Sequence, residues 1–131
     1  MKKSNLNDRQ VLNELLSPVN FLLRLSARAY EKYMGNKIYL HALNIRKANE
    51  MVYRLILDKL HLIPDEIQND CIELLNHYDC WMFQFKDEEQ KRNPLLTDEF
   101  IFYRLDDQMA FPRSSEQHIF ETFKKFNKQK K

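Results

Sequence analysis

The stretch from Pro64 to Lys86 reads PDEIQNDCIELLNHYDCWMFQFK, and its apolar residues recur at steps of three and four. Such steps keep side chains on one face of a helix with 3.6 residues per turn. Pro64 suits the first helical position because its missing N–H would be unpaired there, and Asp65 and Glu66 suit the first turn because the helix dipole favours negative charge. The stretch therefore predicts an amphipathic helix with a stripe to bury, which comprises Ile67, Cys71, Leu74, Leu75, Tyr78, Trp81, Met82 and Phe85.

The two cysteines of the chain, Cys71 and Cys80, lie nine residues apart in this stretch. They fall on opposite faces of a helix, so they can neither bridge each other nor share a metal ion within it. We expect both to be small buried apolar side chains.

The size and composition of the chain narrow its class. Its 131 residues suffice for one domain with its own core, and 31% charged with 44% hydrophobic residues is typical of a soluble globular protein. A single glycine argues against hairpins and sandwiches and excludes glycine-rich phosphate loops. No apolar run approaches the roughly 20 residues of a membrane span, and the N-terminus lacks the apolar core of a signal peptide. We therefore expect a cytoplasmic, all-α protein without membrane contact.

The residues before the central stretch predict two more helices. In the first, Asn5–Leu16 and the residues from Ser17 onward share one apolar phase across Pro18. Because proline lacks an N–H and clashes with the preceding turn, either one helix bends at Pro18 or two helices meet there nearly in line. Gly35 then occupies the position where glycine commonly ends a helix in the left-handed conformation.

The second of these helices is predicted from Lys37 to His61. Residues on its outer face alternate in charge at four-residue intervals. Opposite charges at this spacing pair along an exposed helix and contribute roughly 0.2–0.5 kcal/mol per pair. We expect such a solvated ladder from Arg46, Glu50, Arg54 and Asp58.

The C-terminal third is rich in phenylalanine and irregular in pattern. Leu95–Pro112 is compatible with a helix or an extended stretch, whereas Ser114 and Gln117 form a capping-box pattern that predicts a short final helix. Most phenylalanines follow position 99, so we expect them to cover an open side of the helices or, failing that, to form a surface for a partner. The residues assigned to that surface are Phe100, Phe102, Tyr103, Phe111, Phe120 and Phe123.

Together these elements predict an all-α, antiparallel up-and-down helical bundle, completed by the aromatic-rich C-terminal segment and the short final helix. We expect one domain over residues 1–123 and a frayed, lysine-rich tail over residues 124–131. The net charge is +6 for residues 1–63, −8 for residues 64–107 and +4 for residues 108–131. This distribution favours an acidic segment lying against basic ones, within the chain or across a dimer, over a surface for nucleic acid.

Asp70, Glu73 and His77 share the polar face of the central helix. A metal ion bound there would need a further ligand from another helix, and His41 and His61 are the candidates. A solvated polar face is the better interpretation, so we predict neither a metal nor a cofactor.

The segment Arg113-Ser-Ser-Glu-Gln-His118 places four residues between an arginine and a histidine. It resembles the signature of the HEPN superfamily, small helical bundles that often cleave RNA without a metal, in which the arginine and histidine of two protomers meet across a dimer cleft. The resemblance implies that Arg113 binds the scissile phosphate and that His118 acts as acid or base near neutral pH. The family motif lies within a helix, whereas the cap predicted at Ser114 leaves Arg113 outside one. A second match, with six residues between the arginine and the histidine, joins Arg54 and His61 on the predicted middle helix.

The sequence thus favours a non-catalytic helical interaction protein that self-associates, as a homodimer, through its aromatic C-terminal third. A different protein partner is also compatible with this interpretation. The alternative is a HEPN-like, metal-independent ribonuclease using Arg113 and His118, and nucleic acid is expected as a partner only in that case.

Overall fold

The computed structural model describes residues 4–102 and 111–129 of the chain. This part is helical apart from turns, irregular connections and one isolated bridge, so the all-α class is confirmed. Its α-helices are α1 (Ser4–Val11), α2 (Ser17–Gly35), α3 (Tyr39–Asp58), α4 (Gln68–Arg92) and α5 (Arg113–Gln129).

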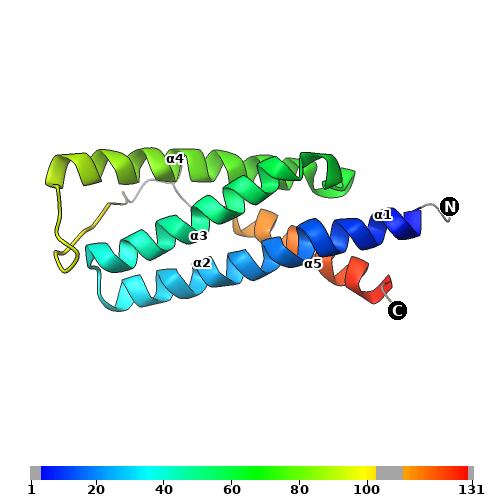
Figure 1. Cartoon of the computed structure of the whole chain (residues 1–131), viewed down its shortest axis with the longest axis horizontal. Coiled ribbons are helices and arrows are strands. Elements are labelled where there is room, and N and C mark those ends of the chain that lie inside the picture. Colours follow the sequence, from blue (N-terminus) through cyan, green and yellow to red (C-terminus); the bar gives the residue numbers. More distant parts are fainter. Residues whose placement is uncertain (1–3, 103–110, 130–131) are drawn as a thin grey trace.

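The helices lie roughly side by side along the long axis of the molecule (Figure 1). Helices α1 and α2 form one rod, α3 returns beside α2, and α4 runs back beside α3. Helix α5 packs against α4, against α2 and against the turn that joins α1 to α2. The start of α1 and the end of α5 lie at the same end of the molecule, opposite the connection between α2 and α3 (Figure 1).

A π-helical turn, Leu12–Leu16, joins α1 to α2 just before Pro18. The N–H of Ser17 donates to the carbonyl of Leu12, five residues back instead of four. Such a wider turn accommodates a local break in the helical hydrogen bonds without ending the helix. Of the two arrangements predicted at Pro18, the structure therefore has one rod with a local π turn.

Helix α4 begins later and ends later than the quoted stretch. A 3-10 turn, Asp65–Ile67, follows Pro64, and the α-helix begins at Gln68 and continues to Arg92. The predicted stripe is nevertheless buried or half-buried along its whole length. Residues 37 to 61 likewise form a helix over Tyr39–Asp58, followed by a 3-10 turn at Leu60–Leu62.

The left-handed helix end lies at Asn93 and not at Gly35. Asn93 has φ 45° and ψ 58°, and its N–H donates to the carbonyl of Glu89 over 2.9 Å. Gly35 has no positive φ, and Asn36 after it is extended. The prediction for Gly35 was wrong because the chain leaves α2 in an extended conformation that any residue adopts.

Two hydrophobic clusters fill the interior. The first is mostly aliphatic and joins the π turn and α2 to the end of α3, the start of α4 and Ile119 of α5. The second is mostly aromatic and lies at the other end of the molecule. Its buried members are Tyr33, Ala42, Ile45, Trp81, Phe85, Phe100 and Phe102.

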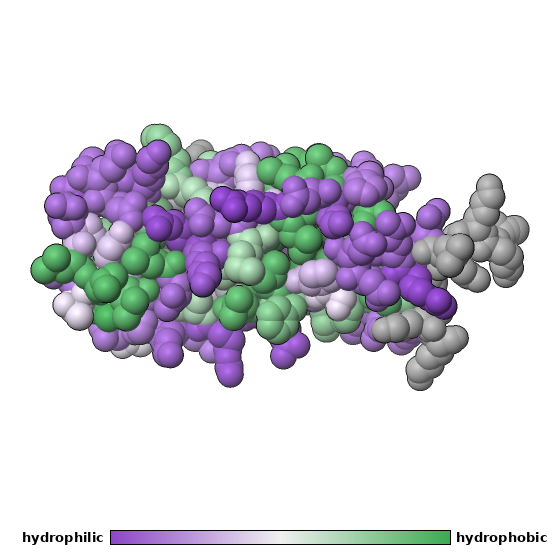
Figure 2. Space-filling view, in the orientation of Figure 1, coloured by the Kyte–Doolittle hydropathy of each residue, from purple (hydrophilic) through white to green (hydrophobic). Residues whose placement is uncertain are grey.

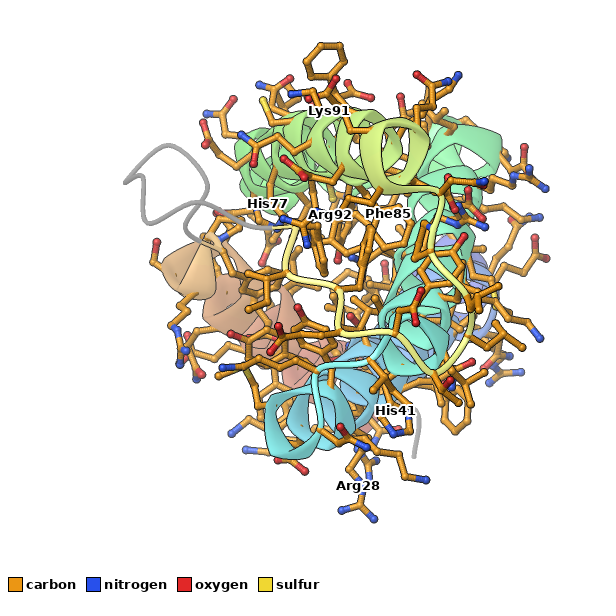
Figure 3. All side chains as sticks on the ribbon, turned by 90° about the vertical axis from the view of Figure 1, so that its left-hand side faces the viewer. Arg28, His41, His77, Phe85, Lys91 and Arg92 are labelled. Atoms are coloured by element: carbon orange, nitrogen blue, oxygen red, sulfur yellow. The ribbon has the colours of Figure 1, made fainter. Side chains whose placement is uncertain are left out.

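The segment after α4 closes the aromatic cluster. The Phe100 N–H donates to the Lys37 carbonyl over 2.8 Å, and the Tyr33 hydroxyl donates to the Phe100 carbonyl over 2.6 Å. Phe85 points from α4 into the space between the helices (Figure 3), where the rings of Phe100 and Phe102 lie 5.2 and 5.0 Å from its ring. Phe100 and Phe102 therefore cover the aromatic rings on this side of the helices.

Ion pairs join the acidic α4 region to basic helices within the chain. Arg46 bonds Glu89 of α4 over 3.1 Å, and its guanidinium lies 5.1 Å from the centre of the Phe85 ring. Arg46 was predicted in a solvated ladder; it faces α4 instead because α3 packs against that helix. Lys125 of α5 similarly lies 3.3 Å from Glu66.

Helix α5 is longer than the short final helix predicted. It begins at Arg113 and continues through Gln129, so residues 124–129 belong to the helix and not to a frayed tail. Phe126 in this part packs against the first hydrophobic cluster, which gives the last turns a reason to stay helical. Among the described residues, no helix combines the length and the apolar character needed to cross a membrane.

Candidate functional site

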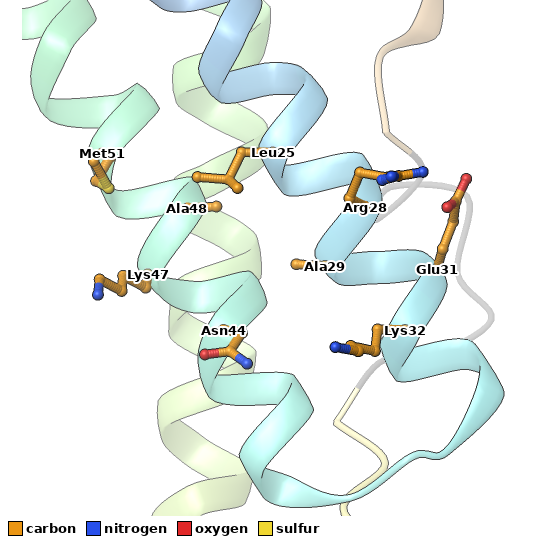
Figure 4. A pocket seen from close by; sticks show the side chains of 9 residues that line it. All are labelled: Leu25, Arg28, Ala29, Glu31, Lys32, Asn44, Lys47, Ala48 and Met51. Atoms are coloured by element: carbon orange, nitrogen blue, oxygen red, sulfur yellow. The ribbon is translucent and has the colours of Figure 1, made fainter.

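A groove runs between α2 and α3, with α4 behind the two helices (Figure 4). Its volume is about 680 Å³. Leu25, Ala48 and Met51 lie close together at one end of the groove, and Lys32 and Asn44 lie at the other end (Figure 4).

The groove exists because small side chains meet where α2 and α3 pack. Ala29 and Ala48 line it, and an alanine has no atoms beyond Cβ to fill the space above a helix contact. A part-buried hydrogen bond beside it fixes the register of the two helices, since the Ser26 hydroxyl donates to the Asn49 side-chain oxygen over 2.6 Å. Asn49 is buried, so losing this bond would leave a desolvated polar group.

The apolar surface continues along α2. A second hollow of about 460 Å³ shares Leu25 and Arg28 with the groove and adds Phe21 and Arg24. Phe21 is 62% exposed, whereas a phenylalanine is normally buried. Figure 2 shows apolar patches over the α2–α3 face that strongly hydrophilic side chains interrupt.

Those hydrophilic side chains are mainly cationic. Arg24, Arg28 and Lys32 follow each other at four-residue intervals along α2, and Lys47 stands on α3 across the groove. Within the described part of the chain, no carboxylate lies within ion-pair distance of any of these cations. Glu31 is the acidic side chain of the lining, so the rim keeps a positive charge.

A different apolar patch lies at the end of the molecule where α3 begins. Leu40 is exposed there beside Leu95 and Leu96, and the Leu40 N–H donates to the Leu96 carbonyl. This patch forms part of the green surface at the left end of Figure 2. It differs from the groove because it is formed partly by the connection after α4 and does not line a hollow.

The residues predicted for the aromatic surface are divided between core and surface. Phe100 and Phe102 are buried, so they are not available to a partner, because α4 presents aromatic rings that they cover. Phe111 and Phe123 are half-buried against the first cluster, and Phe120 is exposed with the Lys124 ammonium over its ring. Tyr103 lies outside the described residues.

The structure does not bring Arg113 and His118 together. Both are exposed on α5, and five residues of α-helix direct them about 140° apart. His118 instead pairs with Asp70 of α4, with 2.6 Å between Nδ1 and Oδ2. Burial raises the pKa of Glu116 on the same helix, and the Arg113 charge partly opposes that shift.

The other polar side chains singled out on α4 also differ in their surroundings. His77 lies edge-on to Phe111 with 5.3 Å between ring centres, and burial lowers its pKa. Cys71 is buried, which raises its pKa to about 12, whereas Cys80 is exposed and so departs from the expected burial. Over residues 4–102 and 111–129, no group of three histidine, cysteine or acidic side chains is placed to hold a metal ion.

No family model, curated protein or solved structure matches this chain. The site therefore rests on the residues themselves. Sequence reasoning missed the groove, although its signal was present in the alternation of apolar and basic residues along the outer face of α2. That alternation comprises Phe21, Arg24, Leu25, Arg28, Ala29 and Lys32.

Proposed function

We propose that this protein is a non-catalytic helical interaction protein of the cytoplasm, an antiparallel up-and-down bundle that binds a protein partner in the α2–α3 groove. The observation that carries this proposal is the combination, in one groove, of exposed apolar side chains with cations that have no acidic partner among residues 4–102 and 111–129. Apolar surface is costly to leave in water, and its contiguous exposure typically marks an interaction site. Unpaired cations around such a surface add selectivity for a partner of opposite charge.

Self-association as a homodimer remains one form of this proposed interaction. The C-terminal third supports it less well than the groove does, because Phe100 and Phe102 are buried within the chain. Of the remaining aromatic residues, Phe120 is exposed while Phe111 and Phe123 are half-buried. A dimer would therefore draw mainly on the groove and on Phe120.

The proposal is tested with the dye 8-anilinonaphthalene-1-sulfonate, which is both apolar and anionic and so suits this groove. We expect the wild type to enhance its fluorescence, and the double variant Leu25→Gln with Met51→Gln to lose most of the enhancement. The control, Leu95→Gln with Leu96→Gln, changes two residues of the other patch that are more exposed than Leu25 and Met51, and it should retain the enhancement. No enhancement by the wild type, or equal enhancement by the groove variant, would contradict the proposal; circular dichroism checks that each variant folds.

A second candidate function, metal-independent RNA cleavage, is favoured by the pair of His118 and Asp70. A carboxylate on Nδ1 holds an imidazole in one orientation and leaves its Nε2 available for proton transfer. We propose His118 as the acid or base and Asp70 as its positioning residue. The phosphate contact would be Arg113 of a second protomer, because Arg113 and His118 of one chain point about 140° apart. Cleavage of labelled single-stranded RNA by the wild type, lost in His118→Ala and reduced in Asp70→Asn, supports this function; no cleavage by the wild type excludes it.

A further inference from the structure

We infer that the occupant of the α2–α3 groove is an acidic amphipathic helix supplied by another protein. This inference rests on the proposed function and adds the chemical class of the partner. Three features support it: the shape of the groove, the positive charge along its rim, and the ion pairs that four carboxylates of α4 already form within this chain.

The groove has the shape that a third helix fits. It lies between two packed helices, and Leu25 and Ala29 mark its α2 side four residues apart. Phe21, one further step along α2, lies in the adjoining hollow that shares Leu25. A helix laid into such a groove presents its own apolar residues at steps of three and four. From Phe21 to Lys32 the α2 side extends over about 16 Å, so an occupant needs roughly three turns to follow it.

The charges along the rim of the groove indicate which residues flank the apolar stripe of the partner helix. Arg24, Arg28 and Lys32 border the groove on one helix, and Lys47 borders it on the other. Glu or Asp residues on both sides of the partner's stripe would meet these cations as the apolar residues enter the groove. Complementary charges of this kind raise association rates and exclude partners of the wrong sign.

Nucleic acid fits the groove less well than such a helix. Leu25, Ala29, Ala48 and Met51 form an apolar lining that would be placed against charged phosphates. Binding of single-stranded nucleic acid relies on aromatic stacking, and Phe21 is the aromatic side chain that the two hollows offer.

A second copy of this chain is a weaker candidate because four of the six carboxylates on its acidic helix already form ion pairs. On α4, Asp70 pairs with His118, Glu89 with Arg46, Asp87 with Lys91, and Glu88 with Arg92. Placing these carboxylates in the groove of another molecule would first break those pairs. An acidic helix from another protein carries no such cost.

The inference is tested by fluorescence anisotropy with labelled designed helical peptides of roughly 16 residues and the full-length protein. The acidic peptide carries leucines at helical spacing flanked by glutamates, and the basic peptide replaces each glutamate by lysine. We expect the acidic peptide to bind the wild type at least tenfold more tightly than the basic one. Arg28→Glu with Lys47→Glu should lose at least tenfold in affinity for the acidic peptide and gain affinity for the basic one.

Lys86→Glu with Lys128→Glu is the matched control, since it changes the net charge equally at exposed positions away from the groove. It should bind the acidic peptide nearly as the wild type does. Equal loss in this control would reduce the effect to net charge and overturn the inference. Circular dichroism shows whether Arg28→Glu with Lys47→Glu still folds. Retained or increased affinity for the basic peptide would also show that this variant has lost a contact and not its fold.

The remaining outcomes identify a different occupant. In one of them the acidic peptide does not bind, whereas a single-stranded RNA oligonucleotide or anionic phospholipid vesicles do. If the variant Arg28→Glu with Lys47→Glu loses that binding, the proposed class of partner is wrong. Self-association of the wild type by sedimentation, lost in the same variant, points to a second copy and overturns it too. If the sulfonate dye binds in the groove but the acidic peptide does not, the inference fails while the proposed function stands; if neither binds, both fail.

Discussion

The two faces of the α2–α3 pair carry similar small residues and end up in different surroundings. On the inner face, Ala42 is covered by the aromatic cluster, which receives rings from α4 and from the segment after it. On the outer face, Ala29 and Ala48 line a groove, and the larger lining residues Leu25 and Met51 remain exposed. A small side chain at a helix contact leaves space beside it and does not determine which group occupies that space. What fills that space depends on whether the chain places a large side chain in it, and on the outer face no described side chain fills the groove.

We expect the largest loss of stability from a substitution in the aromatic cluster, which covers the inner face. Phe85→Ala removes a fully buried ring that lies 5.0 to 5.2 Å from Trp81, Phe100 and Phe102, so we expect a loss of about 3–5 kcal/mol in the free energy of unfolding. Phe83→Ala on the same helix is the control, since Phe83 is 73% exposed and should change stability by less than about 0.5 kcal/mol. Urea denaturation of both variants measures the difference; similar losses would show that the aromatic cluster is not the core of this end.

The next effect tests the hydrogen bond that fixes the register beside the groove. Ser26→Ala leaves the buried Asn49 side chain without this donor, which should cost about 1–3 kcal/mol. Ser17→Ala removes a hydroxyl from an exposed position of the same helix and should cost little. If the two variants unfold at the same urea concentration, the register is held by apolar contacts alone.

The pH dependence of stability tests the region where α4 contacts α5, which lies outside the two faces of the α2–α3 pair. Two titratable groups there are His77 on α4 and Glu116 on α5. Because burial lowers the pKa of His77 below its usual 6.5, the folded protein favours the neutral ring. The resulting stability is present above pH 6.5 and is lost as the pH falls through the lowered pKa of the folded state. Glu116 acts oppositely: its raised pKa favours protonation in the folded protein, which adds stability as the pH falls.

The variant His77→Phe keeps the contribution of Glu116 and removes that of His77. Its stability should therefore fall less than that of the wild type between pH 7 and mildly acidic pH, as measured by thermal unfolding at each pH. A wild type and a variant with parallel pH profiles would mean that His77 is not desolvated in solution.

The smallest effect concerns the surface pair of His118 and Asp70. Its side chains are 51% and 18% exposed, so solvent screens the interaction and His118→Gln should cost no more than about 1 kcal/mol. Urea denaturation at neutral pH measures this cost. A larger loss would indicate that the pair holds α5 against α4, and the comparison of the two faces would then need to include this contact.

Much of the fold was predictable because helical periodicity records which side of each helix is buried. The stripe on α4 was identified from spacing alone, and Ile67, Leu74 and Phe85 in it are fully buried. Helix ends were less predictable, since the left-handed residue is Asn93 and the single glycine adopts an ordinary conformation. Local sequence specifies the face of a helix better than it specifies where the chain turns.

Contacts between distant segments could not be read from spacing. Arg46 has a suitable partner four residues away in Glu50, yet it bonds Glu89, which only the packing of α3 on α4 brings near. The same holds for phenylalanines: composition does not separate Phe100, in the core, from Phe120, at the surface. The groove was missed for a related reason, because whether the outer face of α2 is covered depends on the whole arrangement.

The most direct test of the account observes the groove itself by methyl NMR. Of the five methionines, Met51 lines the groove, whereas Met82 is packed in the aromatic cluster and Met34 stands near the end of α2. In protein labelled with carbon-13 at the methionine methyl groups, with Met51→Leu assigning the signal, we predict that the acidic helical peptide shifts the Met51 signal and leaves the Met82 signal in place. A peptide that binds while the Met51 signal stays unchanged would contradict the claim that the α2–α3 groove is the binding site.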